Sequence, residues 1–216
     1  MKCLVCASEK VEKFEVRRKP RGAYFHCPIC DVIFMDPSER MRPEDEKLRY
    51  DMHENVSTQG YRKFFLPLIQ EIDKFAALKN IHAPNLKILD FGCGPSAFLS
   101  VMLGEKNYRV TNYDIFYFTN QASLQHQYDV ITCTEVWEHF YHPLEEIQQL
   151  TKLLNPGGLL GVMTSAHQGR EHFEGWHYRR DPTHVVFFSE RTMTWIADHF
   201  GLTLTKAQTP HWIFQT

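Results

Sequence analysis

Beyond Pro84, short apolar runs alternate with amphipathic stretches along the rest of the chain. Short apolar runs between turn signals are typical of buried strands, and apolar residues that recur every three or four positions are typical of helices. Repeated strand–helix units predict a doubly wound, mostly parallel α/β sheet with helices on both faces. The expected strands are residues 87–91, 109–113, 128–133, 159–164, 202–205 and 212–214, and the expected helices are residues 97–103, 144–154 and 190–200.

Turn and cap residues mark where several of these elements should begin and end. Asn155-Pro156-Gly157-Gly158 is expected to separate helix 144–154 from strand 159–164. Ser189 is the expected N-cap of the last helix, and Gly201 is its expected left-handed terminator. Upstream, residues 43–80 have helical spacing, and Pro67 is expected to kink that helix or divide it in two.

The N-terminal segment carries paired cysteines. Cys3, Cys6, Cys27 and Cys30 form two C-x-x-C pairs that are 20 residues apart, close to the spacing of a structural zinc site. Two such pairs complete a closed tetrahedral Cys₄ shell, and the ion would supply folding free energy that so short a segment lacks. Redox chemistry is the alternative, and the coexistence of two pairs disfavours it. Residues 11–24, which alternate apolar and charged side chains, are expected to form a hairpin between the pairs.

The overall composition is that of an ordinary globular chain, with 43% hydrophobic and 23% charged residues. The net charge of −2 gives no overall attraction to nucleic acid or to an anionic membrane. No apolar run is long enough to span a bilayer, and the first residues lack the apolar segment of a signal peptide. We therefore expect a cytoplasmic protein without a membrane partner, in which Cys93 and Cys133 are packed thiols rather than nucleophiles.

A glycine turn follows the first expected strand of the α/β region. Gly92 and Gly94 permit positive φ and a close approach of a ligand to the backbone, and the helix that follows favours an anionic group. Asp114, at the end of the second strand and 24 residues after Asp90, is suited to accept both ribose hydroxyls of an adenosine. Ala97 stands where the dinucleotide fingerprint has its third glycine, which favours a nucleoside ligand without a pyrophosphate.

Three ordered motifs resemble those of class I S-adenosylmethionine (AdoMet)-dependent methyltransferases. They are Ile88-Leu89-Asp90-Phe91-Gly92-Cys93-Gly94-Pro95-Ser96, Tyr128-Asp129-Val130-Ile131-Thr132-Cys133-Thr134-Glu135-Val136-Trp137-Glu138-His139 and Leu153-Leu154-Asn155-Pro156-Gly157-Gly158-Leu159-Leu160. The cysteine segment also resembles zinc ribbons that precede small-molecule methyltransferases. The resemblance implies a Rossmann-like, seven-stranded sheet. It divides the chain into a zinc-ribbon module at residues 1–36, a helical linker or lid at 37–84 and a methyltransferase domain at 85–216.

The resemblance also implies roles for the matching residues. Asp90 and the loop Gly92-Cys93-Gly94 would hold the methionine end of AdoMet, and Asp114 would hold its ribose. Thr134 and Glu135 would line the pocket near the methionine part. Family members often have an acidic residue that accepts the adenine amino group, whereas residues 121–125 here read Gln-Ala-Ser-Leu-Gln. A glutamine or backbone groups must then serve.

The methyl acceptor should bind beyond the last parallel strand. Methyl transfer depends largely on positioning and desolvation, and a base is needed only if the acceptor must lose a proton. His184 is our first candidate for a base or orienting group, followed by His139 and Tyr178. The expected lid over AdoMet consists of Tyr50, His53 and Tyr61, although helix packing explains Tyr61 equally well.

Three functions remain open at this point. The preferred one is methyl transfer from AdoMet to a small molecule, with zinc in a structural role. The second is methylation of RNA, docked on the basic segment Arg17-Arg18-Lys19-Pro20-Arg21. A solvated hairpin tip is the commoner explanation of such a segment, so nucleic acid is not the favoured partner. The third is AdoMet binding without catalysis, in a scaffold protein.

Overall fold

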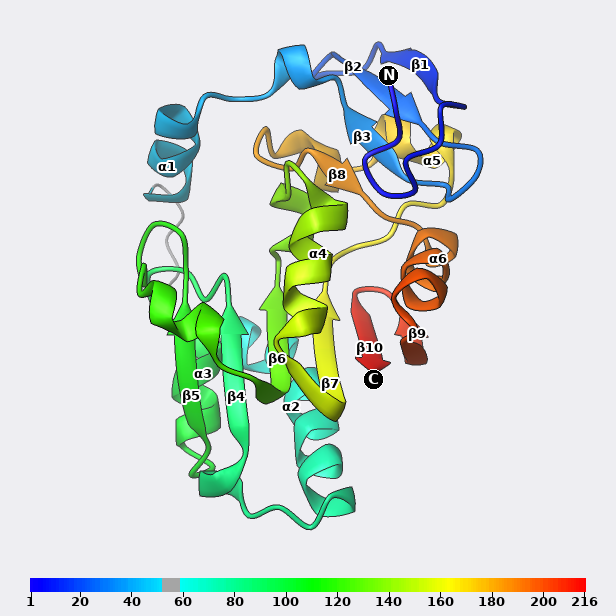
Figure 1. Cartoon of the computed structure of the whole chain (residues 1–216). Helices are drawn as coiled ribbons and strands as arrows, with labels where there is room; N and C mark the ends of the chain where they lie inside the picture. Colours follow the sequence, from blue (N-terminus) through cyan, green and yellow to red (C-terminus); the bar gives the residue numbers. More distant parts are fainter. Residues whose placement is uncertain (52–58) are drawn as a thin grey trace.

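The computed structural model describes residues 1–51 and 59–216, which form a large sheet and a small sheet (Figure 1). The large sheet has the strand order β5-β4-β6-β7-β10-β9, in which β4, β5, β6 and β7 are parallel and β10 is antiparallel to both of its neighbours. The expected mostly parallel α/β class is confirmed. The strands are β4 (Lys87–Phe91), β5 (Arg109–Tyr113), β6 (Tyr128–Thr134), β7 (Leu154–Met163), β9 (Thr203–Gln208) and β10 (His211–Gln215).

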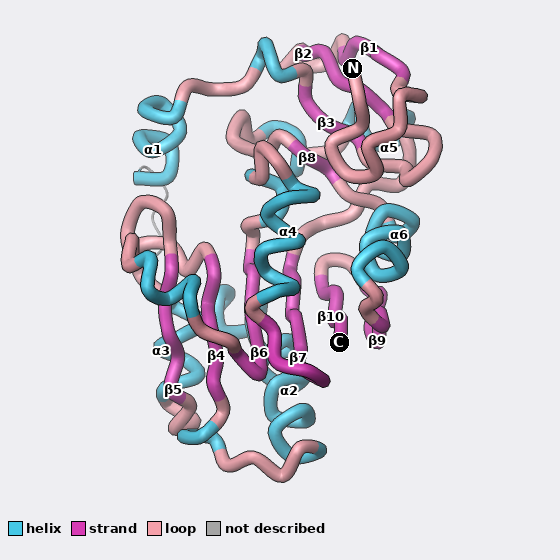
Figure 2. Tube along the Cα trace, viewed as in Figure 1, coloured by secondary structure: helices cyan, strands magenta, loops and turns pink. Residues whose placement is uncertain are grey.

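Helices cover both faces of the large sheet. Alternate residues of a strand point to opposite faces, so Ile88 packs in one apolar cluster and its neighbour Leu89 in another. The Ile88 face is covered by α2 (Gln59–Leu78) and α3 (Phe98–Gly104). The Leu89 face is covered by α4 (Pro143–Lys152) and α6 (Glu190–Phe200). The result is a three-layer α/β/α arrangement whose parallel strands end at one common edge (Figure 2).

Three details of this sheet differ from the expectation. Within the described residues the sheet has six strands instead of seven, because the chain between β5 and β6 forms the 3-10 helix η3 (Gln121–Gln125) and no strand. The expected turn at Asn155-Pro156-Gly157-Gly158 is wrong, since β7 already begins at Leu154 and takes up these residues in a register shift against β6. Of the two outcomes expected at Pro67, a kink or a division, the division is wrong, because α2 runs through that residue as one element.

Helix ends follow the expected chemistry most closely in α6. The Ser189 side chain accepts the backbone N–H of Thr192, and the Thr192 hydroxyl accepts the N–H of Ser189 in return. Gly201 ends the helix in the left-handed conformation, with φ of 65°. Both predicted caps are therefore confirmed, and they set where the chain enters α6 and where it leaves the helix toward β9.

The small sheet joins the N-terminal segment to a C-terminal strand. Its order is β1 (Glu12–Val16), β2 (Gly22–His26), β3 (Ile33–Met35) and β8 (Val186–Phe187). The predicted hairpin is β1–β2, and β3 pairs with β8 through Ile33↔Phe187 and Phe34↔Val186. The apolar side chains of this sheet belong to the same buried cluster as α4 and α6. The cysteine-bearing segment thus shares a core with the rest of the chain.

Short helices connect these layers. The segment between the small sheet and α2 contains η1 (Pro37–Glu39) and α1 (Pro43–Asp51), and η2 (Ala83–Asn85) leads into β4. After β6 come η4 (Trp137–His139) and α4, and after β7 come α5 (Arg170–Gly175) and η5 (Tyr178–Arg180). Within residues 1–51 and 59–216, no helix combines the length and apolar character needed to cross a bilayer.

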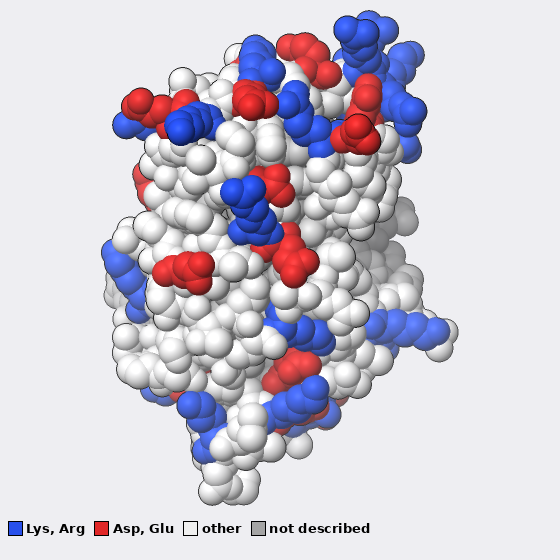
Figure 3. All heavy atoms as spheres, turned by 90° about the vertical axis from the view of Figure 1, so that its right-hand side faces the viewer, with Lys and Arg blue, Asp and Glu red and all other residues white. Residues whose placement is uncertain are grey.

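At the basic tip of the hairpin, the side chains are exposed, whereas the backbone is hydrogen-bonded to the rest of the molecule. Arg17, Arg18, Lys19 and Arg21 are all exposed, and Lys and Arg side chains gather at the top of the face in Figure 3. The backbone carbonyls of Arg18 and Pro20 accept hydrogen bonds from the buried guanidinium of Arg179, at 3.1 and 2.7 Å. The tip is therefore a structural contact as well as a charged surface.

We expect Leu68→Ala to lower the free energy of unfolding by about 2–5 kcal/mol, because Leu68 is fully buried between α2 and the sheet and its removal leaves a cavity. Leu66→Ala, on the exposed side of the same helix, should change stability by no more than about 0.5 kcal/mol. Urea unfolding followed by circular dichroism measures both. Equal effects would contradict the burial of this face.

Candidate active site

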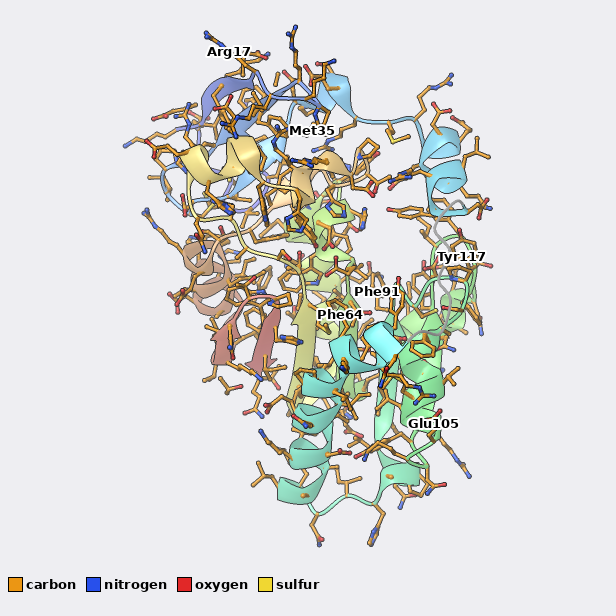
Figure 4. The ribbon with its side chains drawn as sticks, turned by 180° about the vertical axis from the view of Figure 1, so that it is seen from behind. Arg17, Met35, Phe64, Phe91, Glu105 and Tyr117 are labelled. Carbon is orange, nitrogen blue, oxygen red and sulfur yellow. The ribbon has the colours of Figure 1, made fainter. Side chains whose placement is uncertain are left out.

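A cavity of about 910 Å³ lies at the carboxyl edge of the parallel strands, a volume within the range of ligand pockets, about 300–1,000 Å³. Phe64, Phe91 and Tyr117 mark its wall in Figure 4. Six carboxyl groups line it, and no lining residue in the described part of the chain is Lys or Arg. The cavity therefore favours a cationic occupant. It brings together every predicted cofactor and acceptor residue: Asp90, Gly92, Cys93, Gly94, Asp114, Thr134, Glu135, His139, Tyr178 and His184.

The glycine turn has the geometry that the sequence predicts. Gly92 and Gly94 have φ of 73° and 64°, a region that residues with a side chain rarely adopt. A Cβ on Gly92 would lie 2.4 Å from Cγ2 of Val136. Cys93 is half-buried, and burial raises the pKa of its thiol, so it stays a neutral lining group. Glycine is thus required at position 92 for two reasons: the positive φ of the turn and the close approach of Val136 in the loop after β6.

Asp114 holds this turn in place from the neighbouring strand. Its Oδ2 accepts the backbone N–H of Gly94 at 3.0 Å, and its Oδ1 accepts the N–H groups of Phe116 and Tyr117 at 2.8 and 3.2 Å. The two oxygens of a carboxylate offer about four acceptor sites, and three are used here, so one site remains on Oδ2. Asp114 therefore joins the two loops that border the cavity and can still accept a hydrogen bond from a ligand.

Asp90 is buried beneath the turn. Its carboxylate accepts hydrogen bonds from the hydroxyl groups of Thr132 at 2.9 Å and Ser100 at 3.3 Å. Burial raises the pKa of Asp90 to about 6, because removal from water penalises the charged form more than these two bonds favour it. A cationic ligand group nearby would relieve this penalty. Ser100 was not among the predicted residues, and its position in the helix after the turn was the available signal.

On the opposite side of the cavity, a tyrosine hydroxyl lies between two carboxyl groups. The Tyr178 hydroxyl contacts Oε2 of Glu135 at 3.0 Å, Oε1 of Glu138 and the hydroxyl of Thr164 at 3.3 Å. Burial, with the charge of Glu138 as the second cause, raises the pKa of Glu135 to about 9. Burial also raises the pKa of Tyr178. We did not predict Glu138 as a site residue, although it belongs to the Glu-His pair of the second motif.

The two histidines predicted for the acceptor side lie against each other. The ring centroids of His139 and His184 are 4.8 Å apart, and the rings are edge to face. Nδ1 of His139 contacts the carbonyl of Thr183 at 3.0 Å, and Nδ1 of His184 contacts the carbonyl of Tyr178 at 2.8 Å. Burial lowers the pKa of His139 to about 4, so this imidazole is neutral at physiological pH.

The predicted lid is described only in part. Tyr50 and Tyr61 both line the cavity, and His53 lies outside the described residues. The Tyr50 hydroxyl donates to Glu46 at 3.0 Å, and its ring packs edge to face on His139, with centroids 5.3 Å apart. Helix α1 thus brings Glu46, which we did not predict, to the wall of the cavity beside Tyr50.

The segment expected to face adenine contributes an apolar side chain. Leu124 of η3 lines the cavity, whereas Gln121 and Gln125 do not. The side-chain amide of Gln121 donates to the hydroxyl of Tyr113 at 3.2 Å. Backbone groups therefore remain as the polar contacts that η3 can offer to a base.

The four N-terminal cysteines meet at a separate place in the fold. Their sulfur atoms all lie within 4.8 Å of one another, with Cys3–Cys30 at 3.6 Å and Cys6–Cys27 at 3.5 Å. A disulfide requires about 2.05 Å, whereas four sulfurs about 2.3 Å from a central zinc ion are about 3.8 Å apart. Sγ of Cys3 also accepts the N–H groups of Val5 and Cys6 at 3.4 Å. This donor set fits a tetrahedral zinc ion.

Comparison with known proteins agrees with this geometry. Residues 60–207 match the model of a family described as a methyltransferase domain, which is more than half of the chain. The chain therefore belongs to this methyltransferase family. Among curated proteins, none matches it.

Solved structures share the fold at low sequence identity. The N-methyltransferase NodS from Bradyrhizobium japonicum, in complex with S-adenosyl-L-homocysteine, has 15% identity and a TM-score of 0.54, over 80% of this chain and 97% of that one. A putative sarcosine dimethylglycine methyltransferase from Galdieria sulphuraria has 14% identity and a TM-score of 0.52, over 76% of each chain. An O-methyltransferase family protein from Burkholderia thailandensis has 13% identity and a TM-score of 0.49, over 79% of this chain. Less than two thirds (61%) of that protein is covered.

We expect the stability of the ligand-free protein to depend on the protonation of Asp90. Its folded pKa of about 6 lies above the ordinary value of 3.8, so its stabilising contribution is complete below pH 3.8 and is lost as the pH rises through 6. The stability of the wild type relative to Asp90→Asn should fall by up to about 3 kcal/mol between pH 4 and pH 7. Urea unfolding across this pH range measures the difference. Asp198→Asn, at an exposed position of α6, is the control, and a pH-independent difference for Asp90→Asn would contradict the expectation.

Proposed function

We propose that this protein transfers a methyl group from AdoMet to a small-molecule acceptor. The observation that carries the proposal is that the glycine turn and the acceptor-side cluster of Tyr178, His139 and His184 line one cavity. Donor and acceptor can therefore meet within the molecule. The match to the methyltransferase family over residues 60–207 supports the reaction class.

The donor end of the cavity suits AdoMet. Its sulfonium and ammonium groups are cationic, and six carboxyl groups line a cavity whose described wall has no Lys or Arg. In this proposal Asp90 and the loop Gly92-Cys93-Gly94 hold the methionine end, and Thr134 and Glu135 line the space beside it. Asp114 holds the ribose by accepting a ribose hydroxyl at the remaining site of Oδ2.

At the acceptor end, positioning and desolvation supply most of the rate acceleration. The sulfonium already activates the methyl group, so the transfer needs an aligned nucleophile in a water-poor cavity. His184 acts as an orienting group or base, with His139 and Tyr178 as further candidates. Neutral His139 does not need to lose a proton before it accepts one.

The zinc ribbon has a structural role in this proposal. Cys3, Cys6, Cys27 and Cys30 would hold one zinc ion in a closed shell that leaves no position for a substrate. RNA methylation, the alternative, requires docking on the basic tip of the hairpin. The backbone of that tip is bound to Arg179 inside the molecule, so the tip has a structural role that does not involve RNA.

We expect calorimetry to detect AdoMet binding, and Asp114→Ala to weaken it at least tenfold, or about 1.4 kcal/mol. The substitution removes both the ribose acceptor and the brace on Gly94. Asp129→Ala is a matched control, because Asp129 braces the backbone of Lys87 at the other end of the strands, outside the cavity. Unchanged affinity in Asp114→Ala would remove Asp114 from the cofactor site.

A second experiment tests the acceptor class. The protein should transfer labelled methyl groups from AdoMet to a component of metabolite extract and not to total RNA.

We expect elemental analysis of the purified chain to show that Cys27→Ser loses about one zinc ion per chain relative to the wild type, because three thiolates hold the ion far less tightly than four. Cys93→Ser should retain the wild-type content, since Cys93 lies in the glycine turn and not with the other four. A folded wild type without zinc would disprove the Cys₄ site.

A further inference from the structure

A second group of metal-ligating side chains borders the cavity: His139 and His184 belong to its wall, and Glu138 is fully buried and outside the lining. Glu138 and His139 come from η4, and His184 comes from the loop before β8. Each can offer one ligand atom such that all three atoms lie within 4.8 Å of one another. Glu138 and His184 are buried, and His139 is partly exposed. Three side chains from two distant segments therefore converge on one point.

The hydrogen bonds of the two histidines use Nδ1 of each ring and leave Nε2 for a metal ion. A backbone carbonyl can only accept, so Nδ1 of His139 and Nδ1 of His184 must each carry the hydrogen in these bonds. In the neutral form of a ring bonded in this way, the lone pair of Nε2 is available to a metal. Metal-ligating histidines are typically oriented in this way, by an N–H to carbonyl bond from the other ring nitrogen.

The third side chain has an unsatisfied oxygen. Glu138 is fully buried, and its Oε2 has no hydrogen-bond partner among the described residues. A buried carboxylate oxygen without a partner is costly unless a cation or a donor compensates it. No described Lys or Arg lines the cavity to supply that charge. A cation bound beside the cluster would compensate this oxygen.

We propose that Glu138, His139 and His184 bind a divalent transition-metal ion that holds an oxygen of the methyl acceptor. Two imidazoles and one carboxylate suit Zn²⁺, Fe²⁺ or Mn²⁺, and three protein ligands leave positions open for a substrate. The inference rests on the proposed function, because it assigns a task to the acceptor end of the same cavity. It also narrows the acceptor to a compound whose hydroxyl can bind such an ion.

The chemical step balances without a redox partner. The bound ion lowers the pKa of the acceptor hydroxyl, whose proton leaves to water. The resulting oxyanion forms a bond to the methyl carbon of AdoMet as the carbon–sulfur bond breaks, and the sulfur keeps the electron pair. The products are a methyl ether, S-adenosylhomocysteine and one proton. His184 then orients the acceptor through the ion and does not act as the base.

Titration of the zinc-containing protein with Mn²⁺, followed by electron paramagnetic resonance, tests the site. Mn²⁺ prefers oxygen and nitrogen ligands and competes poorly for the thiolates of the Cys₄ shell. We expect one Mn²⁺ per chain with micromolar affinity, weakened at least tenfold by Glu138→Gln and by His184→Gln. His177→Gln is the matched control, because His177 lines the same cavity outside the cluster.

Thermal unfolding of each variant identifies any that does not fold, and two ligand variants are used so that one failure leaves the other informative. Absence of stoichiometric Mn²⁺ binding to the folded wild type would overturn the metal site, as would equal binding by both ligand variants. AdoMet affinity is measured on the same samples. AdoMet binding without Mn²⁺ binding refutes the metal site and leaves the proposed function standing, and Mn²⁺ binding without AdoMet binding refutes the proposed function.

Discussion

The buried guanidinium of Arg179 is the contact on which the assembly of the two sheets depends. It is 2% exposed and donates to the carbonyls of Arg18 and Pro20 in the hairpin and to those of Phe173 and Glu174 in the C-terminal part. A charged group at this depth is tolerated only when its donors are satisfied, and the planar fork of arginine satisfies them with fixed geometry. Arg179 therefore fixes the segment around η5 to the hairpin of β1 and β2.

This arrangement has a consequence for the cavity. Arg179 is the neighbour of Tyr178, and β8, which pairs with β3 of the ribbon, follows His184 directly. The loop that carries both acceptor-side residues is thus anchored to the ribbon at two points. The N-terminal sheet is distant from the glycine turn in the sequence, yet it shares a buried cluster with Tyr178 and Val185.

The parts of the site that sequence predicted best are those set by local backbone chemistry. The glycine turn and the caps of α6 follow from residues within a few positions of one another, because φ preferences and capping bonds are local. Asp114 followed from its place at the end of the second expected strand. The turn at residues 155–158 and the division at Pro67 failed for the opposite reason. Pairing of β7 with β6 and β10, and packing of α2 on the sheet, outweighed the local preferences.

The sequence alone determined the α/β class, the cysteine set and the glycine turn that lines the cavity, since periodicity, spacing and short motifs encode them. Only the tertiary structure decided that Glu138, His139 and His184 converge, because 45 residues separate His139 from His184 in the chain and no spacing rule links them. The tertiary structure also decided that Nδ1 of each histidine bonds to a backbone carbonyl, which leaves Nε2 without that bond. Side-chain direction and burial depend on contacts between distant segments, and a linear pattern carries no information about those contacts.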